Sequence, residues 1–163
     1  MRIGVLSDTH MPGRAKKLPE QLLRDFAQVD HIVHAGDWNT LDVYEQLRLL
    51  APVDGVAGNT DGSDIVKRFG YKKVLQLGAV RIGLTHGDRG AGLTEDNALN
   101  MFFGEQVDCV VFGHSHIPLL AEKRGVLLFN PGSPTDKRWQ ERHSYGMLEI
   151  SEAGKVTARH IYL

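Results

Sequence analysis

The sequence has almost no cysteine and no strong excess of charge of either sign. Cys109 is the only cysteine in 163 residues, which excludes an intramolecular disulfide and fits a reducing compartment. Its thiol lies within an apolar run, so we interpret it as a buried structural residue rather than a nucleophile. The formal net charge is -1, so the chain as a whole has no positive field to attract nucleic acid or an anionic membrane.

Long apolar segments are also missing. No apolar run approaches the roughly 20 residues that a helix needs to cross a bilayer, and the stretch before Asp8 is too short for a secretory signal peptide. We therefore expect a cytoplasmic protein without a membrane partner. Hydrophobic residues make up 42% of the chain and charged residues 24%, as is typical of globular proteins. The length predicts one domain over residues 1–163.

The first part of the chain alternates between strand and helix patterns. Short β-branched and aliphatic runs predict strands, and the segments between them have the apolar spacing of helices. The strands are expected at 2–7, 31–35 and 53–57 and the helices at 18–26 and 41–50, the second helix capped by Thr40. This order predicts parallel strands joined by crossover helices.

The rest of the chain is richer in strands. Residues 73–77 and 80–85 flank Gly78-Ala79 and predict a hairpin, and Thr94 is expected to cap a helix over 95–103. A buried strand is predicted at 109–112. Later strand-like runs, which we interpret as antiparallel, occupy 119–122, 126–129, 145–150 and 156–162. The fold class is therefore α/β, with parallel and antiparallel strands mixed.

Polar residues follow the apolar strands at five places. The motifs are Asp8-Thr9-His10, Gly36-Asp37, Gly58-Asn59-Thr60-Asp61, His86-Gly87-Asp88 and Gly113-His114-Ser115-His116. In α/β folds the loops beyond the carboxyl ends of parallel strands form the ligand crevice, so residues distant in sequence meet there. Each motif alone is explained as well by a solvated turn or a hydrogen-bonded histidine. Together they indicate a metal cluster, because burying several imidazoles and carboxylates is costly unless something pairs them.

The types of ligand narrow the choice of metal. Structural zinc is disfavoured, because the chain has no cysteine cluster and the candidate ligands come from five separate loops. Mixed imidazole, carboxylate and amide ligands suit Mn, Fe, Zn, Co or Ni. Asp8 and His10 are two residues apart, so on an extended chain they would point the same way and share one ion.

The order of these motifs over residues 8–116 resembles the calcineurin-like metallophosphoesterase family. Asn130-Pro131-Gly132-Ser133 extends the likeness to its small single-domain bacterial and archaeal phosphodiesterases. The resemblance implies a four-layer sandwich of two mixed β-sheets flanked by helices, with a dinuclear metal site at the strand carboxyl ends. It also implies a phosphodiesterase that hydrolyses phosphate esters by attack of a metal-bridging hydroxide.

The resemblance carries roles onto individual residues. It implies that Asp8, His10, Asp37 and His116 bind one metal, that Asp37, Asn59, His86 and His114 bind the other, and that Asp37 bridges the two. Asp37, Asn59 and His86 are expected to be essential for catalysis. The cofactors would be two divalent ions, manganese first, with Fe, Zn, Ni or Co as alternatives. The expected partner is a small-molecule phosphate ester, and the size of the chain is compatible with a homodimer or a larger homo-oligomer.

One residue departs from the pattern of larger family members. They carry a histidine directly after the ligand asparagine, where this chain has Thr60. A hydroxyl is a poorer acid catalyst near neutral pH, so protonation of a poor leaving group is open to question. The alternative function is a non-catalytic protein-binding scaffold of the same fold, like the retromer scaffold subunit. A nuclease is a third hypothesis, disfavoured because no basic face or second domain is present.

Other polar and aromatic residues receive weaker assignments. Asn130–Ser133 is either a Pro-Gly turn or part of the site. Arg138 is interpreted as a surface residue that could reach a phosphate, and the basic loop at Arg14 as solvated, with phosphate steering as its second interpretation. His34 is expected to be structural. Trp38 and Trp139 either pack or form the wall of a pocket.

Overall fold

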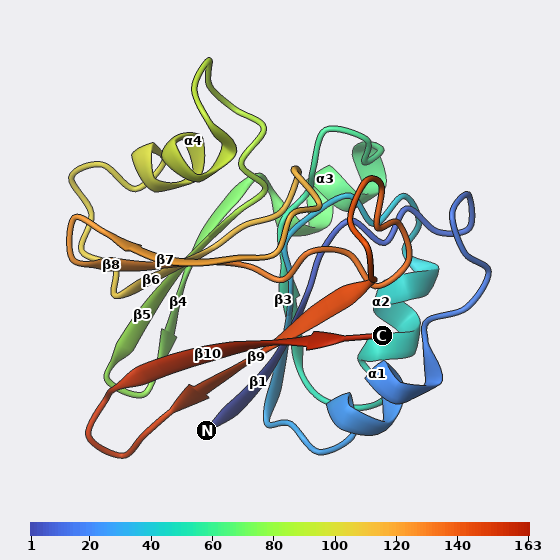
Figure 1. The fold of residues 1–163 in the computed structure, drawn as a ribbon, viewed down its shortest axis with the longest axis horizontal. Helices are drawn as coiled ribbons and strands as arrows, with labels where there is room; N and C mark the ends of the chain where they lie inside the picture. Colours follow the sequence, from blue (N-terminus) through green and yellow to red (C-terminus); the bar gives the residue numbers. More distant parts are fainter.

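The computed structural model describes all 163 residues and contains two five-stranded sheets with helices on their outer faces (Figure 1). The strand order is β10-β9-β1-β2-β3 in the first sheet and β4-β5-β6-β8-β7 in the second. In chain order the elements are β1 (Arg2–Leu6), α1 (Glu20–Phe26), β2 (His31–His34), α2 (Asp42–Leu47), β3 (Val53–Gly55), α3 (Ser63–Phe69), β4 (Lys72–Leu77), β5 (Val80–Thr85), α4 (Thr94–Asn100), β6 (Cys109–Val111), β7 (Leu119–Lys123), β8 (Val126–Asn130), β9 (Ser144–Ile150) and β10 (Val156–Tyr162).

Parallel pairing is concentrated where the site will form. In the first sheet β1 pairs with β2 and β2 with β3, and in the second β6 lies between β5 and β8, all in parallel. The other neighbouring strands are antiparallel. Strands that pair in parallel end at the same edge of a sheet, so each sheet brings three carboxyl ends to one edge.

Three apolar cores hold the layers together. Side chains of β1 alternate, because Ile3 and Val5 pack against the second sheet while Leu6 packs against the helices on the opposite face. α1, α2 and α3 cover the outer face of the first sheet, and α4 covers that of the second. The expected four-layer α/β sandwich is therefore confirmed. None of the helices is long and apolar enough to span a membrane.

Cys109 lies in the core between the two sheets. Its side chain is fully buried, and burial raises the pKa of the thiol to about 12. A thiolate is therefore unavailable at neutral pH, and the interpretation of Cys109 as a structural residue is confirmed.

Local helix signals were less reliable than the strand pattern. Thr40 and Thr94 do not cap helices: α2 begins at Asp42 after Leu41, and Thr94 is itself the first residue of α4. Helix α3 was not predicted, because only Ile65 and Phe69 are buried along its seven residues. Two apolar positions are too few to produce a recognisable helical period.

Strand β8 corrects the expectation for the last third of the chain. The β7–β8 and β9–β10 pairs are antiparallel as predicted, yet β8 also pairs in parallel with β6. Its side chains point into two cores, Leu128 toward α4 and Phe129 toward the first sheet. A strand that is buried on both faces has a continuous apolar sequence. Such a sequence does not indicate whether the neighbouring strand is parallel or antiparallel.

Asp54 links the two sheets at the β3 edge. Its Oδ1 accepts a hydrogen bond of 2.8 Å from Nζ of Lys73 in β4, and its Oδ2 lies 3.0 Å from Nε2 of His31 in β2. The hydrogen bond with His31 lowers the pKa of Asp54 to about 2, and Lys73 adds to this effect against the opposing influence of burial.

We expect Asp54→Asn to lower the free energy of unfolding at pH 7 by only about 1 kcal/mol, because solvent partly screens the interactions of Asp54 with His31 and Lys73. The carboxyl pKa is about 2 in the fold against an ordinary value of 3.8, so ionised Asp54 stabilises the protein above pH 4. This contribution is lost as the pH falls toward 2. Urea unfolding at pH 7, 4 and 2.5 measures it, with Asp64→Asn as an exposed control. A wild-type to variant difference that does not shrink with falling pH would contradict the assignment.

Candidate metal centre

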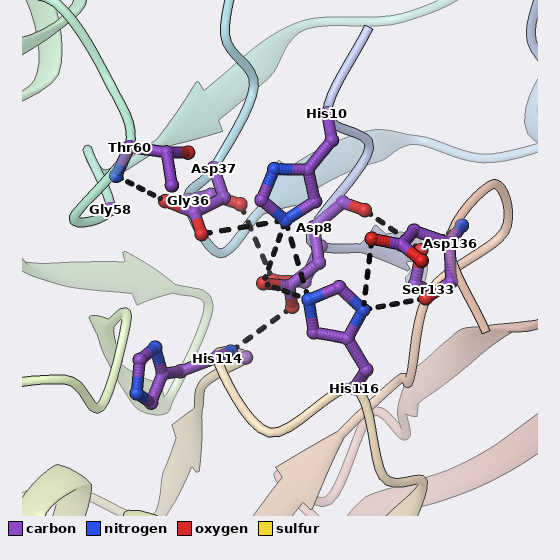
Figure 2. A network of polar contacts seen from close by, with 12 residues as sticks. Asp8, His10, Gly36, Asp37, Gly58, Thr60, His114, His116, Ser133 and Asp136 are labelled. Atoms are coloured by element: carbon purple, nitrogen blue, oxygen red, sulfur yellow. Dashed lines mark hydrogen bonds and ion pairs between the residues drawn. The ribbon is translucent and has the colours of Figure 1, made fainter. Parts of the chain in front are cut away.

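The loops that follow β1, β2, β3, β5 and β6 meet at one edge of the sandwich (Figure 2). Their polar side chains come from both sheets, and each lies within contact distance of at least one other. The structure brings together all the residues predicted as ligands: Asp8, His10, Asp37, Asn59, His86, His114 and His116.

The backbone is left-handed at most of these positions. The φ angle is 56° at Asp8, 44° at His10, 58° at Asp37, 69° at His114 and 60° at His116. Such conformations are unfavourable for non-glycine residues by about 1–3 kcal/mol each and are concentrated at functional sites. They also correct the expectation of an extended Asp8-Thr9-His10 segment. The chain turns at both ends of this motif and still brings Oδ1 of Asp8 within 3.9 Å of Nε2 of His10.

Asp8, His10 and His116 form one group of candidate ligands. Nε2 of His116 lies 3.3 Å from Oδ1 of Asp8 and 3.3 Å from Nε2 of His10. The two imidazole rings are stacked, with their centroids 5.2 Å apart. All three side chains are buried, so their nitrogen and oxygen atoms point at one another rather than at solvent.

Asp37 joins this group to a second one. Its Oδ2 lies 3.5 Å from Nε2 of His10 and 3.2 Å from Nε2 of His86, between the two histidines. Oδ1 of Asn59 is 3.1 Å from Nε2 of His86 and 3.0 Å from Nδ1 of His114. The carboxylate of Asp37 therefore lies between the two groups of candidate ligands.

One oxygen atom of the cluster has no hydrogen-bond partner. Oδ2 of Asp8 accepts the backbone N–H of His114 at 3.0 Å, whereas Oδ1 is buried and unpartnered. A buried polar atom of this kind destabilises a protein unless something satisfies it. A bound cation would do so, and the surrounding imidazole, carboxylate and amide donors suit divalent transition metals. The residues present therefore fit a metal centre.

The charges of the cluster favour a cation. Burial opposes protonation of His86, but the hydrogen bond to Asp37 and the charges of Asp8 and Asp37 raise its pKa to about 9. Burial would raise the pKa of Asp37, yet the interaction with His86 holds it well below its ordinary value. Without a metal the two carboxylates hold a proton on His86, and metal binding would release it.

Backbone carbonyls fix the orientation of two histidines. Nδ1 of His86 lies 2.7 Å from the carbonyl oxygen of Ala35, and Nδ1 of His116 lies 2.5 Å from that of Asp136. A carbonyl only accepts, so Nδ1 carries a proton in each ring, and Nε2 faces the cluster with a lone pair that is free when the ring is neutral.

Asp61 holds two of the loops together, a role that the sequence interpretation did not give it. Its Oδ2 accepts the backbone N–H groups of Asp37 at 2.9 Å and Gly58 at 2.8 Å, and its Oδ1 accepts that of Asn39 at 2.8 Å. An aspartate inside a glycine-rich turn is a signal for such side-chain to backbone hydrogen bonds. Two of the partners, Asp37 and Asn39, however, lie on another loop and could not be found from the sequence.

The Asn130–Ser133 segment does more than turn the chain. Nδ2 of Asn130 donates to the carbonyl oxygen of Gly113 at 2.9 Å, and the hydroxyl of Ser133 donates to that of Asp8 at 2.8 Å. The segment therefore holds the loops after β6 and β1, and both of its polar side chains support the site.

Trp38 and His34 lie beneath the cluster. Trp38 is fully buried and stacks on His34 at 3.7 Å and on Phe69 at 4.8 Å between ring centroids, so it packs and does not line a pocket. Burial lowers the pKa of His34 to about 3. This neutral histidine lies 3.0 Å from the hydroxyl of Thr9 and supports the β1 loop.

The comparison with known proteins agrees with this geometry. Residues 1–153 match the model of the calcineurin-like phosphoesterase superfamily domain, and the chain belongs to this family of metal-dependent enzymes that act on phosphate esters. A probable metallophosphoesterase of Methanocaldococcus jannaschii is 37% identical to it over 162 residues, which cover 99% of this chain and 81% of that protein.

Solved structures share the fold over almost their whole length. Wild-type Vps29 of Entamoeba histolytica, solved in complex with Zn²⁺, matches with a TM-score of 0.80 and 24% identity over 99% of both chains. An archaeal phosphodiesterase matches with a TM-score of 0.76 and 24% identity over 100% of both chains. At this level of identity the likeness shows the fold alone.

We expect Asp61→Asn to weaken Mn²⁺ binding by about tenfold, because partners behind metal ligands typically have effects of this size. The new amide group cannot accept at both ends, so its NH₂ would face a backbone N–H of Asn39, Asp37 or Gly58. Isothermal titration with Mn²⁺ measures the affinity, and urea unfolding with chelator present measures the loss of the loop contacts. Unchanged Mn²⁺ affinity, equal to that of the Asp64→Asn control, would contradict this role.

Proposed function

We propose that this protein is a dinuclear metal-dependent phosphodiesterase that hydrolyses small-molecule phosphate esters. The unpartnered, buried Oδ1 of Asp8 among imidazole nitrogens and a second carboxylate carries the proposal. Its metal ligands would be Asp8, His10, Asp37 and His116 for one ion and Asp37, Asn59, His86 and His114 for the other. Manganese is our first choice of metal, with Fe, Zn, Ni or Co as alternatives that the same donors would accept.

Two divalent ions held by these residues would activate water near neutral pH and offset the charge that develops on the phosphoryl group. The contribution of the chain is to fix the donors before substrate binds. Oδ1 of Asp37 accepts the N–H of Thr60 at 2.9 Å, which keeps Oδ2 turned toward His10 and His86. Donors that are already in place need no reorganisation during the reaction.

Exposure indicates the side from which substrate approaches. Asp8, Asp37 and His86 are buried, whereas Asn59 is exposed and His114 is partly exposed. Asn59 and His114 therefore mark an accessible side of the cluster, and a phosphate ester bound there would have the buried ligands behind it.

We expect His86→Ala to lower the hydrolysis of bis(p-nitrophenyl) phosphate by more than about 100-fold, and Asp37→Asn to do the same, because the cluster acts as a unit. The double variant should be little worse than either single one. Release of p-nitrophenol measures activity, and metal analysis by mass spectrometry measures the ions bound per chain. His143→Ala, a histidine outside the cluster, is the matched control. Near-normal turnover in either metal-replete site variant would refute the assignment.

The fold likeness to Vps29 favours a second candidate, a non-catalytic scaffold. The Entamoeba histolytica structure holds Zn²⁺, so metal binding alone does not separate the two functions. Turnover does. A protein that binds two divalent ions per chain but hydrolyses neither aryl diesters, alkyl diesters nor monoesters would be assigned to the scaffold class.

Thr60 gives a test of leaving-group protonation. Its side chain is exposed and donates to Oδ1 of Asn39 at 2.7 Å, while its backbone N–H, which any residue except proline keeps, holds Asp37. Thr60→His should therefore preserve the cluster and add an acid at this position. We expect kcat/KM for a dialkyl phosphate to rise by about tenfold or more relative to an aryl diester. Thr60→Gln is the polar control, and equal alkyl ester rates in the two variants would refute the idea.

A further inference from the structure

A surface hollow of about 480 Å³ is lined by Arg14, Asp136, Arg138 and Trp139. Its volume is in the range typical of sites for small molecules. None of these side chains is among the proposed metal ligands. The hollow therefore needs an explanation separate from the binding of the metal ions.

Asp136 lines the hollow and also contacts His116, one of the candidate metal ligands. Its carbonyl oxygen lies 2.5 Å and its carboxylate Oδ2 3.8 Å from Nδ1 of His116 (Figure 2). The same Oδ2 lies 3.3 Å from Nε of Arg14. A molecule whose phosphate is at the metal centre could thus place its remaining part in the hollow.

Trp139 is presented to solvent by a closed turn. Its side chain is 96% exposed, in contrast to the buried Trp38. The turn is held by two hydrogen bonds, from the Gln140 N–H to the Lys137 carbonyl at 2.9 Å and from Nζ of Lys137 to the Gln140 carbonyl at 3.0 Å. An indole held away from every core on a fixed turn leaves both its faces free to stack on a ligand.

The charge of the hollow is positive. Arg14 pairs with Asp136, which leaves Arg138 without an acidic partner. Arg138 also has a left-handed backbone, with φ of 48°, a conformation that is uncommon for residues other than glycine. An unpaired guanidinium is suited to phosphate oxygens.

We propose that this hollow binds the nucleoside part of a nucleotide-derived phosphodiester. The base stacks on Trp139, and Arg138 contacts an oxygen of the phosphate beside the metal centre. The inference rests on the proposed function, because it places the reacting phosphate among the metal ligands. Neighbouring guanidinium and indole groups match a phosphate joined through a sugar to a planar base, whereas a simple alkyl ester would leave the indole without a partner.

Two substrates with the same leaving group test this inference. They are the p-nitrophenyl ester of thymidine 5′-monophosphate and methyl p-nitrophenyl phosphate. Trp139→Ala should lower kcat/KM for the thymidine ester by about tenfold, since stacking on a base typically has an effect of this size, and should leave the methyl ester within about twofold. Arg138→Ala should lower both, because both substrates carry the phosphate. Phe103→Ala and Arg124→Ala are matched controls, the first an 85% exposed aromatic and the second an arginine with φ of 53°.

Binding of thymidine 5′-monophosphate gives a readout that does not depend on turnover. The wild type should bind it more tightly than Trp139→Ala by about tenfold in isothermal titration. The proposed nucleoside subsite is overturned if Trp139→Ala lowers kcat/KM equally for both substrates. It is also overturned if the variant lowers kcat/KM for neither substrate. In both cases the assignment as a hydrolase stands. If the wild type hydrolyses neither substrate, the proposed function fails. In that case the titration tests the subsite by itself. Equal affinity of the wild type and Trp139→Ala for thymidine 5′-monophosphate would overturn it.

Discussion

The burial of two carboxylates at strand ends is the constraint on which the rest of the site depends. Asp8 and Asp37 are both almost completely buried, and their charges are balanced only by histidines or a cation. The first sheet supplies the carboxylates, and His86 and His116 come from the second. Packing of the two sheets through the shared apolar core therefore assembles the cluster. A substitution that disturbs the core between the sheets would therefore also displace the polar side chains of the cluster.

The glycines in the motifs follow from the same constraint. A Cβ atom at Gly58 would overlap the carboxylate of Asp37, and one at Gly113 would overlap Ser7 and approach Oδ2 of Asp8. These contacts join loops from different strands, and at Gly113 they join loops from different sheets. Glycine precedes Asn59 and His114 because two backbones must approach closely where the polar side chains converge. The Gly-Asn and Gly-His pairs are therefore packing requirements as well as turn signals.

The sequence predicts the features of the site that depend on local pattern and misses those that depend on distant partners. Apolar runs followed by Asp, Asn or His indicate which strands end at the site, because a short stretch of sequence is enough to show where a buried strand stops and polar residues begin. The left-handed turns at Asp8 and His10, the parallel partner of β8 and the contacts of Asp61 were not predicted. Each depends on a partner distant in the chain, such as the backbone N–H of Asp37 for Asp61. Local patterns do not specify such partners, and family resemblance supplied the ligand grouping in their place.

In the function and subsite that we propose, the segment from Asn130 to Gln140 links the candidate metal ligands to the recognition of substrate. The hydroxyl of Ser133 holds the Asp8 loop, and the carbonyl of Asp136 orients His116. The turn that follows carries Arg138 and Trp139, which line the surface hollow together with Asp136. A metal pair interacts with phosphate and carries no information about the alcohol attached to it. In the function that we propose, discrimination comes from residues around the metals, and this segment links Arg138 and Trp139 through Asp136 to the candidate ligand His116. In the subsite that we propose, a shift of the turn would therefore disturb both the orientation of His116 and the binding of the alcohol.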